Sequence, residues 1–306
     1  MNADNSGGDM VEMPAAGPLP HGLWPDTGSA RVQVDLAAAT HRGHVRSANE
    51  DHYLVLRGGR SLETLFTSLP AGQVPARADE VGYGLLVADG IGGSAGGELA
   101  SRTALSMLVS LVLHTPDWVL SPEPRDAERV LRRVAEHYRR IHEALSEQGR
   151  ADPELARMGT TMTLAGSLGT TLIVGHVGDS RAYLFREGRL CQLTRDHTFV
   201  QSLVDMGLLS PDEAASHPWR HVLTASLGGG GNRYEGEFQR AWLADGDQLL
   251  LCTDGLTNMV DGATIMTVLR GAATSEEACQ ALVAAALEAG GKDNVTVALA
   301  RYRFAR

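Results

Sequence analysis

Four strand-like segments follow one another between residues 160 and 194, and they constrain the fold more than any other part of the chain. They cover 160–166, 170–177, 182–186 and 190–194, and Gly169 and Gly188 mark two of the short turns between them. Strands joined by such short turns pair antiparallel, because a parallel pair needs a crossover of a dozen or more residues. The sequence therefore predicts antiparallel sheet structure.

The remaining predicted elements add helices to such sheets. Apolar residues at helical spacing predict helices at 98–114, 126–148 and 276–289. Further strands are expected at 32–36, 51–56, 85–88, 238–243, 248–252 and 295–302. This order lacks the strict βαβ alternation of a parallel sheet, so we predict an α+β fold in which helices cover antiparallel sheets.

The chain is expected to form one large domain. Residues 1–30 are rich in Gly, Pro, Ala and Asp without sustained periodicity, and we expect a disordered or loosely ordered tail there. The domain then covers 31–303. Residues 57–82 have a weak pattern and are long for a loop, so we interpret them as an insertion. Residues 197–219 are predicted to be a partly helical segment that covers the sheet edge.

Charge and cysteine content argue against several classes of function. The formal net charge of -10 disfavours binding to nucleic acid or to anionic membranes. Three widely spaced cysteines without a CxxC pair predict neither a disulfide framework nor a zinc site. No apolar run is long enough to span a bilayer, and no signal-peptide pattern opens the chain. We expect a cytoplasmic protein with no nucleic-acid or membrane partner.

Acidic residues recur where a strand or helix ends in a Gly, Ser or Asn turn. Five segments have this form: 49–51, 89–90, 179–180, 254–255 and 292–294. Each alone is typical of a turn. Together they offer several carboxylate oxygens, which are the ligands that Mg²⁺ and Mn²⁺ prefer. The sequence therefore indicates a site for hard cations.

A dinucleotide-binding fingerprint is a rival interpretation of the segment after Asp89. Residues 90–95 match the GxGxxA pattern that follows a strand and precedes a helix. That pattern requires an acidic residue at the end of a second strand about 20 positions later. Residues 106–114 are instead predicted to be helical, and the strands that follow are antiparallel. We therefore favour the metal-site interpretation.

Seven short motifs, in their order and spacing, resemble those of the metal-dependent protein serine/threonine phosphatases of the PP2C (PPM) family, in its bacterial form. They are RSANED at 46–51, VADGIGG at 87–93, GTT at 159–161, GHVGDSR at 175–181, LTRDH at 193–197, CTDG at 252–255 and KDNVT at 292–296. The resemblance covers about residues 31–302. It implies a four-layer αββα sandwich of two antiparallel sheets flanked by helices, with a centre of two Mn²⁺ or Mg²⁺ ions at one end.

The resemblance also implies a ligand set for these ions. Asp89 would bridge the two metals. Asp254 and Asp293 would complete one site, and Glu50 with the Gly90 carbonyl would serve the other.

Three more residues receive roles from the same resemblance. Asp51 would hold a metal-bound water. Asp179 would join Asp254 at a third, weaker metal, or would only cap a turn. Arg46 would bind the substrate phosphate, because a forked guanidinium suits phosphate oxygens better than an ammonium does.

The activity that the resemblance implies is hydrolysis of phosphoserine and phosphothreonine in proteins, by in-line attack of a water shared by two metal ions. The substrates would be phosphorylated proteins made by a bacterial Ser/Thr kinase, and we expect a monomer. Residues 197–219 correspond to the mobile flap of bacterial relatives, and this flap and the 57–82 insertion are expected to influence substrate choice. The alternative is a catalytically weak relative that binds phosphoproteins as a regulator.

Two positions depart from the family pattern. Ile91 stands where many eukaryotic members have a histidine that is thought to protonate the leaving alkoxide, although isoleucine is common in bacterial members. The general acid is therefore unassigned, with metal-bound water, His41, His44 and His197 as candidates. Ser226 stands where an arginine is frequent, which predicts a different floor beneath the flap.

Overall fold

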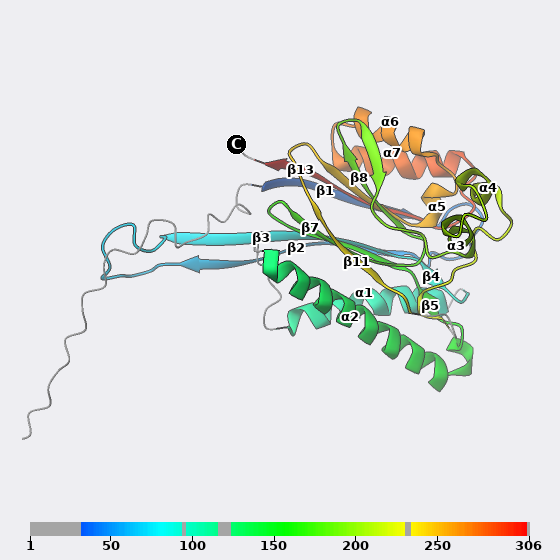
Figure 1. Cartoon of the computed structure of the whole chain (residues 1–306), viewed down its shortest axis with the longest axis horizontal. Helices are drawn as coiled ribbons and strands as arrows, with labels where there is room; N and C mark the ends of the chain where they lie inside the picture. Colours follow the sequence, from blue (N-terminus) through cyan, green and yellow to red (C-terminus); the bar gives the residue numbers. More distant parts are fainter. Residues whose placement is uncertain (1–31, 94–95, 116–123, 230–233, 305–306) are drawn as a thin grey trace, which may run out of the picture.

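Two antiparallel sheets packed face to face form the centre of the protein, and helices cover both outer faces (Figure 1). The computed structural model describes residues 32–93, 96–115, 124–229 and 234–304. Within them the expected αββα sandwich is confirmed. The tail expected at 1–30 lies outside the described residues.

Each main sheet has five strands, and a small third sheet lies at one end. The first sheet has the order β1 (Val32–His41), β13 (Val295–Phe304), β12 (Gln248–Cys252), β8 (Arg181–Arg186) and β9 (Arg189–Gln192). The second has the order β11 (Glu237–Trp242), β7 (Thr171–Val177), β6 (Met162–Leu168), β3 (Arg77–Ala88) and β2 (His52–Glu63). The third joins β10 (Leu227–Gly228), β5 (Gly159–Thr160) and β4 (Gly90–Ile91).

Long helices cover the outer faces of the two main sheets (Figure 1). Helices α1 (Gly96–Leu113) and α2 (Pro124–Ala151) lie on the second sheet, and α6 (Gly262–Gly271) and α7 (Ser275–Glu288) lie on the first. The shorter helices are η2 (Pro153–Leu155), α3 (Phe199–Asp205), α4 (Pro211–Ser216) and α5 (Asp254–Thr257). Among the helices described, none has both the length and the apolar character needed to cross a membrane.

Strands β3 and β12 are buried on both faces, which explains their unbroken apolar runs. In β3, Leu85 and Val87 face the core between the sheets, while Leu86 and Ala88 pack toward α1 and α2. In β12, Leu251 belongs to the core between the sheets and Cys252 packs beneath α7. Both strands end fully buried, so the residue that follows each one has a fixed position.

Half of the predicted insertion at 57–82 is strand, in the segments 57–63 and 77–82. Strands β2 and β3 pair without interruption from His52↔Ala88 to Glu63↔Arg77. Their far ends form a hairpin that extends beyond the rest of the sheet (Figure 1). Few residues there are buried on either side, so the alternation of apolar and polar residues that marks a half-buried strand is missing.

The dinucleotide-binding interpretation is wrong for the described part of the chain. After β3 the chain enters β4, which pairs antiparallel with β5, and only then begins α1. The sheet ladders are antiparallel throughout the described strands, whereas that fold requires a parallel sheet.

Candidate functional site

Asp89 is the first residue after β3, and two threonines hold its backbone. Its amide donates to Thr161 Oγ1 at 3.0 Å, and its carbonyl accepts from the Thr161 amide at 2.9 Å and from Thr160 Oγ1 at 2.8 Å. Both backbone polar groups of Asp89 are therefore satisfied by β5 and the residue after it. The Asp89 carboxylate is thus not needed to satisfy the backbone groups of its own residue.

Asp254 is the second residue after β12 and the first residue of α5, with Thr253 between the strand and the helix. Thr253 joins the ends of two strands, because its amide donates to the Thr296 carbonyl and its Oγ1 accepts from the Thr296 amide, both at 3.0 Å. The same hydroxyl donates to Asp51 Oδ2 at 2.8 Å. One threonine thus brings together β12, β13 and the segment that carries Glu50 and Asp51.

Asn294 joins the Arg46–Asp51 segment to the start of β13. Its Oδ1 accepts from the Glu50 amide at 2.8 Å, and its Nδ2 donates to the carbonyls of Arg42 and Ala48, both at 2.9 Å. Its neighbour Asp293 accepts from Arg46 at 2.6 Å. The Arg46 side chain is 56% exposed, so its guanidinium is accessible to an incoming anion.

The first turns of α1 pack directly against Glu50 and Gly90. Ser101 Oγ donates to the Glu50 carbonyl at 2.6 Å. A Cβ at Gly97 would lie 1.9 Å from Glu50 Oε2, and a Cβ at Gly90 would lie 2.3 Å from the Gly97 carbonyl oxygen. Only glycine fits either position, so the close approach of helix, carboxylate and turn depends on both glycines.

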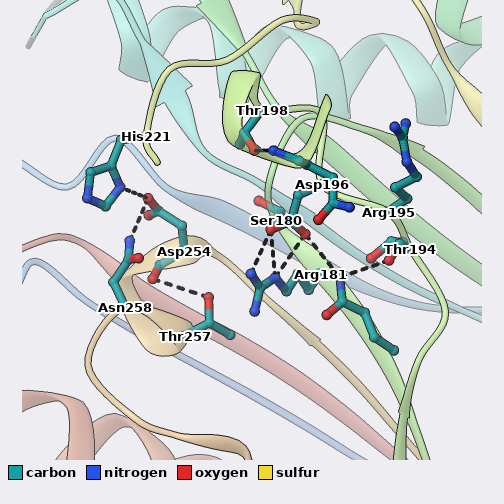
Figure 2. A network of polar contacts seen from close by, with 12 residues as sticks. Ser180, Arg181, Thr194, Arg195, Asp196, Thr198, His221, Asp254, Thr257 and Asn258 are labelled. Atoms are coloured by element: carbon teal, nitrogen blue, oxygen red, sulfur yellow. Dashed lines mark hydrogen bonds and ion pairs between the residues drawn. The ribbon is translucent and has the colours of Figure 1, made fainter. Parts of the chain in front are cut away.

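The surroundings of Asp254 include a histidine from the chain that follows the 197–219 segment (Figure 2). His221 Nδ1 lies 3.8 Å from Asp254 Oδ2, and Asn258 Nδ2 donates to the same oxygen at 2.9 Å. The His221 side chain is 46% exposed. It therefore lies where it meets both solvent and a site carboxylate.

Asp179 is buried in a turn held by an arginine clamp. Arg181 donates to Asp196 through Nε at 2.9 Å and through Nη2 at 2.6 Å (Figure 2). This bidentate pair fixes the turn that carries Asp179 against the chain before α3. Asp179 thus faces Asp254 from a rigid support, and the charge of Asp254 raises the pKa of Asp179 further than burial alone.

Burial, and after it charge repulsion, raises the pKa values of the carboxylates at this end of the sandwich. Loss of solvent raises the pKa of Asp89 well above its ordinary value, and nearby carboxylates raise it further. Those carboxylates are Asp51, Asp254, Asp179 and Asp293. Burial likewise raises the pKa of Asp51 to about 7, and the pKa values of Glu50 and Asp254 also lie above their ordinary values. The protein holds negative charges together at a cost that a bound cation would remove.

The donor set fits hard cations. Asp51 Oδ1 is buried and has no hydrogen-bond partner, although Thr253 occupies Oδ2. Such an orphaned acceptor indicates a missing water or ion. As the side chains stand, no three acidic, histidine or cysteine groups of the described residues enclose a single metal position. The carboxylate of Asp293, which is paired with Arg46 here, would have to leave that partner to bind an ion.

The structure argues against His197 as a general acid. Its ring is 6% exposed, and its Nδ1 accepts from the Gly178 amide at 3.1 Å. Burial lowers its pKa, so the ring is neutral and anchors the start of the flap. His41 is the last residue of β1 and His44 lies in the loop before Arg46. Neither forms a described hydrogen bond or ion pair with a site carboxylate. Ile91 lies in β4 opposite Gly159.

Sequence reasoning missed four residues that build this site. Thr161, Thr253 and Asn294 lie inside the quoted motifs, so their position beside the acidic residues was a usable signal. Ser226, already singled out from the sequence, is not one of these four; it is fully buried directly before β10. His221 lies outside every motif, and nothing in the local sequence distinguishes it from a surface histidine.

The fold and this carboxylate cluster define a class of αββα proteins with an acidic centre at one end. A profile of the protein phosphatase 2C family matches residues 75–292. The chain belongs to the protein phosphatase 2C family.

Individual relatives agree with that assignment. The serine/threonine protein phosphatase PstP of Mycobacterium tuberculosis is 37% identical over 273 residues, which cover 89% of this chain but 46% of PstP. This chain thus spans about half the length of that relative. Protein phosphatase PhpP of Streptococcus pneumoniae is 31% identical over 268 residues, 87% of this chain and 96% of PhpP.

Solved structures show the same fold. The catalytic domain of PstP in complex with two manganese ions matches with a TM-score of 0.68 and 32% identity, over 89% of this chain and 99% of that one. The serine/threonine phosphatase of S. agalactiae matches with a TM-score of 0.72 and 30% identity, over 88% and 99% of the two chains.

Proposed function

We propose that this protein is a metal-dependent serine/threonine phosphatase that hydrolyses phosphoserine and phosphothreonine in proteins. The observation that supports it most is the cluster of carboxylates with raised pKa values that four separate segments bring to one end of the sandwich, beside an accessible arginine. Kinship with PstP and PhpP agrees with this assignment.

The residues would hold two Mn²⁺ or Mg²⁺ ions, and a third, weaker one. Asp89, whose pKa four neighbouring carboxyl groups raise, would contact both ions. Asp254 and Asp293 would serve one ion, and Glu50 with the Gly90 carbonyl the other. Asp179 and Asp254 would share the third. When bound, the ions would neutralise phosphate charge and lower the pKa of water at the site. The manganese ions in the related PstP structure support this ligand chemistry.

The chain's own side chains would bind the substrate and orient the attacking water. Arg46 would turn from Asp293 to the phosphate oxygens, for which its planar guanidinium is well shaped. Asp51 Oδ1 would accept a hydrogen bond from the water, because Thr253 already holds Oδ2 in place. No side chain needs to form a covalent bond to phosphorus.

The cellular setting is part of the same proposal. The substrates would be proteins phosphorylated by a bacterial Ser/Thr kinase, and the protein would act as a cytoplasmic monomer without nucleic-acid or membrane partners. The catalytic domain would cover 31–303, behind an N-terminal tail at 1–30. The 57–82 hairpin and the flap at 197–219 would distinguish substrates.

Hydrolysis of p-nitrophenyl phosphate and of a phosphothreonine peptide tests the proposal. Wild type should turn over both when Mn²⁺ is added, and Asp89→Asn should lose at least a hundredfold in rate. Asp261→Asn, at an exposed helix cap on α6, is the matched control and should behave as wild type. No turnover with Mn²⁺, combined with retained binding of the phosphopeptide, would favour a phosphoprotein-binding regulator instead.

A further inference from the structure

A cavity of about 320 Å³ lies between the second sheet and the two helices that cover it. Its walls come from β2, β3, β6 and β7 on one side, and from the second half of α1 and the first half of α2 on the other. None of its lining residues belongs to the candidate functional site. Its volume lies in the range of small-molecule sites, which is roughly 300 to 1,000 Å³.

Glycines create this cavity. Gly58 pairs with Gly82, and Gly84 pairs with Gly166, so neighbouring strands lack side chains on the face beneath the helices. A Cβ added at Gly166 would meet no heavy atom within 4 Å, and one at Gly84 would make only ordinary contact, at 3.7 Å, with Leu56. Open space in a protein interior is unusual, because side chains normally pack as densely as in organic crystals.

The remaining walls are aliphatic. Leu108, Val112, Val134 and Leu164 line the cavity. Leu56 and Leu113 also line it and are 39% and 66% exposed, so the cavity communicates with solvent on their side. An apolar cavity of roughly half this volume, engineered in another protein, stays dry and takes up benzene.

Polar residues interrupt the aliphatic lining at Arg57, Glu80 and Arg133, and at one uncharged pair that lies between the two helices. Thr115 Oγ1 and His137 Nε2 lie 3.4 Å apart, and His137 is 6% exposed. Burial lowers the pKa of His137, and the nearby arginines at 133 and 140 lower it further, so its ring is neutral. Glu80, an acidic lining residue, is already paired with Arg60. The uncharged Thr115–His137 pair therefore suits the hydroxyl of a ligand better than a charged group.

We propose that this cavity binds an aliphatic molecule of medium chain length that ends in a hydroxyl. The alkyl chain would lie over the glycine floor beneath α1 and α2, and the hydroxyl would hydrogen-bond with Thr115 and His137. The site is separate from the carboxylate cluster, so its occupation does not depend on metal or on phosphatase activity.

A series of straight-chain 1-alcohols from butanol to decanol tests the proposal by calorimetric titration of the metal-free chain. We expect saturable binding of one molecule per chain. The Kd should fall about fourfold with each added methylene until the cavity is full, and then level off.

Variants whose side chains fill the cavity distinguish binding inside it from non-specific binding of the alcohol to the protein surface. Gly166→Leu should weaken 1-octanol binding at least tenfold without lowering the melting temperature, and Gly84→Val provides a second route should the first variant not fold. Gly262→Leu, an exposed glycine of α6 with open space around it, is the matched control and should bind as wild type does. Absence of saturable binding for every alcohol, or equal binding by both cavity-filling variants, would overturn the proposal.

Discussion

At the scale of single residues, the site is a set of charges kept together against their repulsion. Asp89 is held through its backbone by Thr160 and Thr161, so its Cα is fixed beside its acidic neighbours. Asp51 has one carboxylate oxygen buried without a partner. Both features reduce the stability of the metal-free protein and favour cation binding.

Replacing Asp89 by asparagine should therefore stabilise the metal-free protein while removing activity. The amide keeps the shape of the carboxyl group and removes one charge from the cluster. We expect a gain of about 1 kcal/mol in the free energy of unfolding, or about 2 to 4 °C in melting temperature. Thermal unfolding in EDTA measures it, with Asp261→Asn as the control. A lower melting temperature for Asp89→Asn would contradict this description of the cluster.

Arg46 should contribute to substrate binding through its shape as well as its charge. Arg46→Lys keeps the charge but loses the planar fork, so kcat/KM for a phosphothreonine peptide should fall about tenfold or more. The affinity for Mn²⁺ should change less than threefold, because Arg46 is not expected to be a ligand. Steady-state kinetics and a metal titration of the same preparation distinguish these effects. Unchanged kcat/KM would remove Arg46 from the proposed mechanism.

At the scale of elements, buried strands deliver the acidic residues and a helix supports them. Strands β3 and β12 could be predicted from the sequence, because burial on both faces leaves a continuous apolar run that ends at Asp89 and Asp254. Helix α6 was not predicted, and the far end of the β2–β3 hairpin was interpreted as a loop. Helix α6 has only ten residues, and the far end of the hairpin has no buried residue, so neither segment offered a long pattern to recognise.

The contacts between elements were the least predictable part of the site. Asn294 reaches Glu50 across 244 positions of sequence, and Thr253 reaches Asp51 across 202. No local pattern encodes such contacts, and only the family resemblance brought these segments together beforehand. The contact of His221 with Asp254 could not be predicted even from the family motifs, because only the path of the chain after the flap brings the two residues together.

Helix α1 should control metal affinity through Gly97. Gly97→Ala would normally favour a helix, but its Cβ would lie 1.9 Å from Glu50 Oε2 and so displace that carboxylate. We expect at least tenfold weaker Mn²⁺ binding with an unchanged far-ultraviolet circular dichroism spectrum. Gly271→Ala in α6, where a Cβ meets open space, should leave the affinity unaltered. Equal Mn²⁺ affinity in the two variants would show that Mn²⁺ binding does not depend on the observed position of the Glu50 carboxylate.

At the scale of the whole molecule, the carboxylate cluster should determine how stability depends on pH. Groups with raised folded-state pKa values add stability below their unfolded pKa, and this stability is lost as pH rises through the folded pKa. For Asp51 the window runs from about 4 to about 7, and Asp89, Asp179 and Asp254 act in the same direction. Only the folded sandwich brings these carboxyl groups together, so this pH dependence of stability arises in the folded state.

The metal-free protein should consequently melt at a higher temperature at pH 5.5 than at pH 7.5, by at least about 2 °C. Calorimetric scans in EDTA measure this difference. Mn²⁺ should reverse the order, because it binds the ionised carboxylates and stabilises the protein most at the higher pH. A metal-free protein that is more stable at pH 7.5 would show that the cluster does not dominate its titration.

The most direct test of the account is a calorimetric titration of the full chain with Mn²⁺ at pH 7.5, comparing wild type with Asp89→Asn. We expect wild type to bind two Mn²⁺ ions per chain and the variant to bind at least one of them a hundredfold more weakly. A wild-type protein that binds no Mn²⁺, or a variant that binds it as wild type does, would contradict the central claim that Asp89 bridges a metal centre.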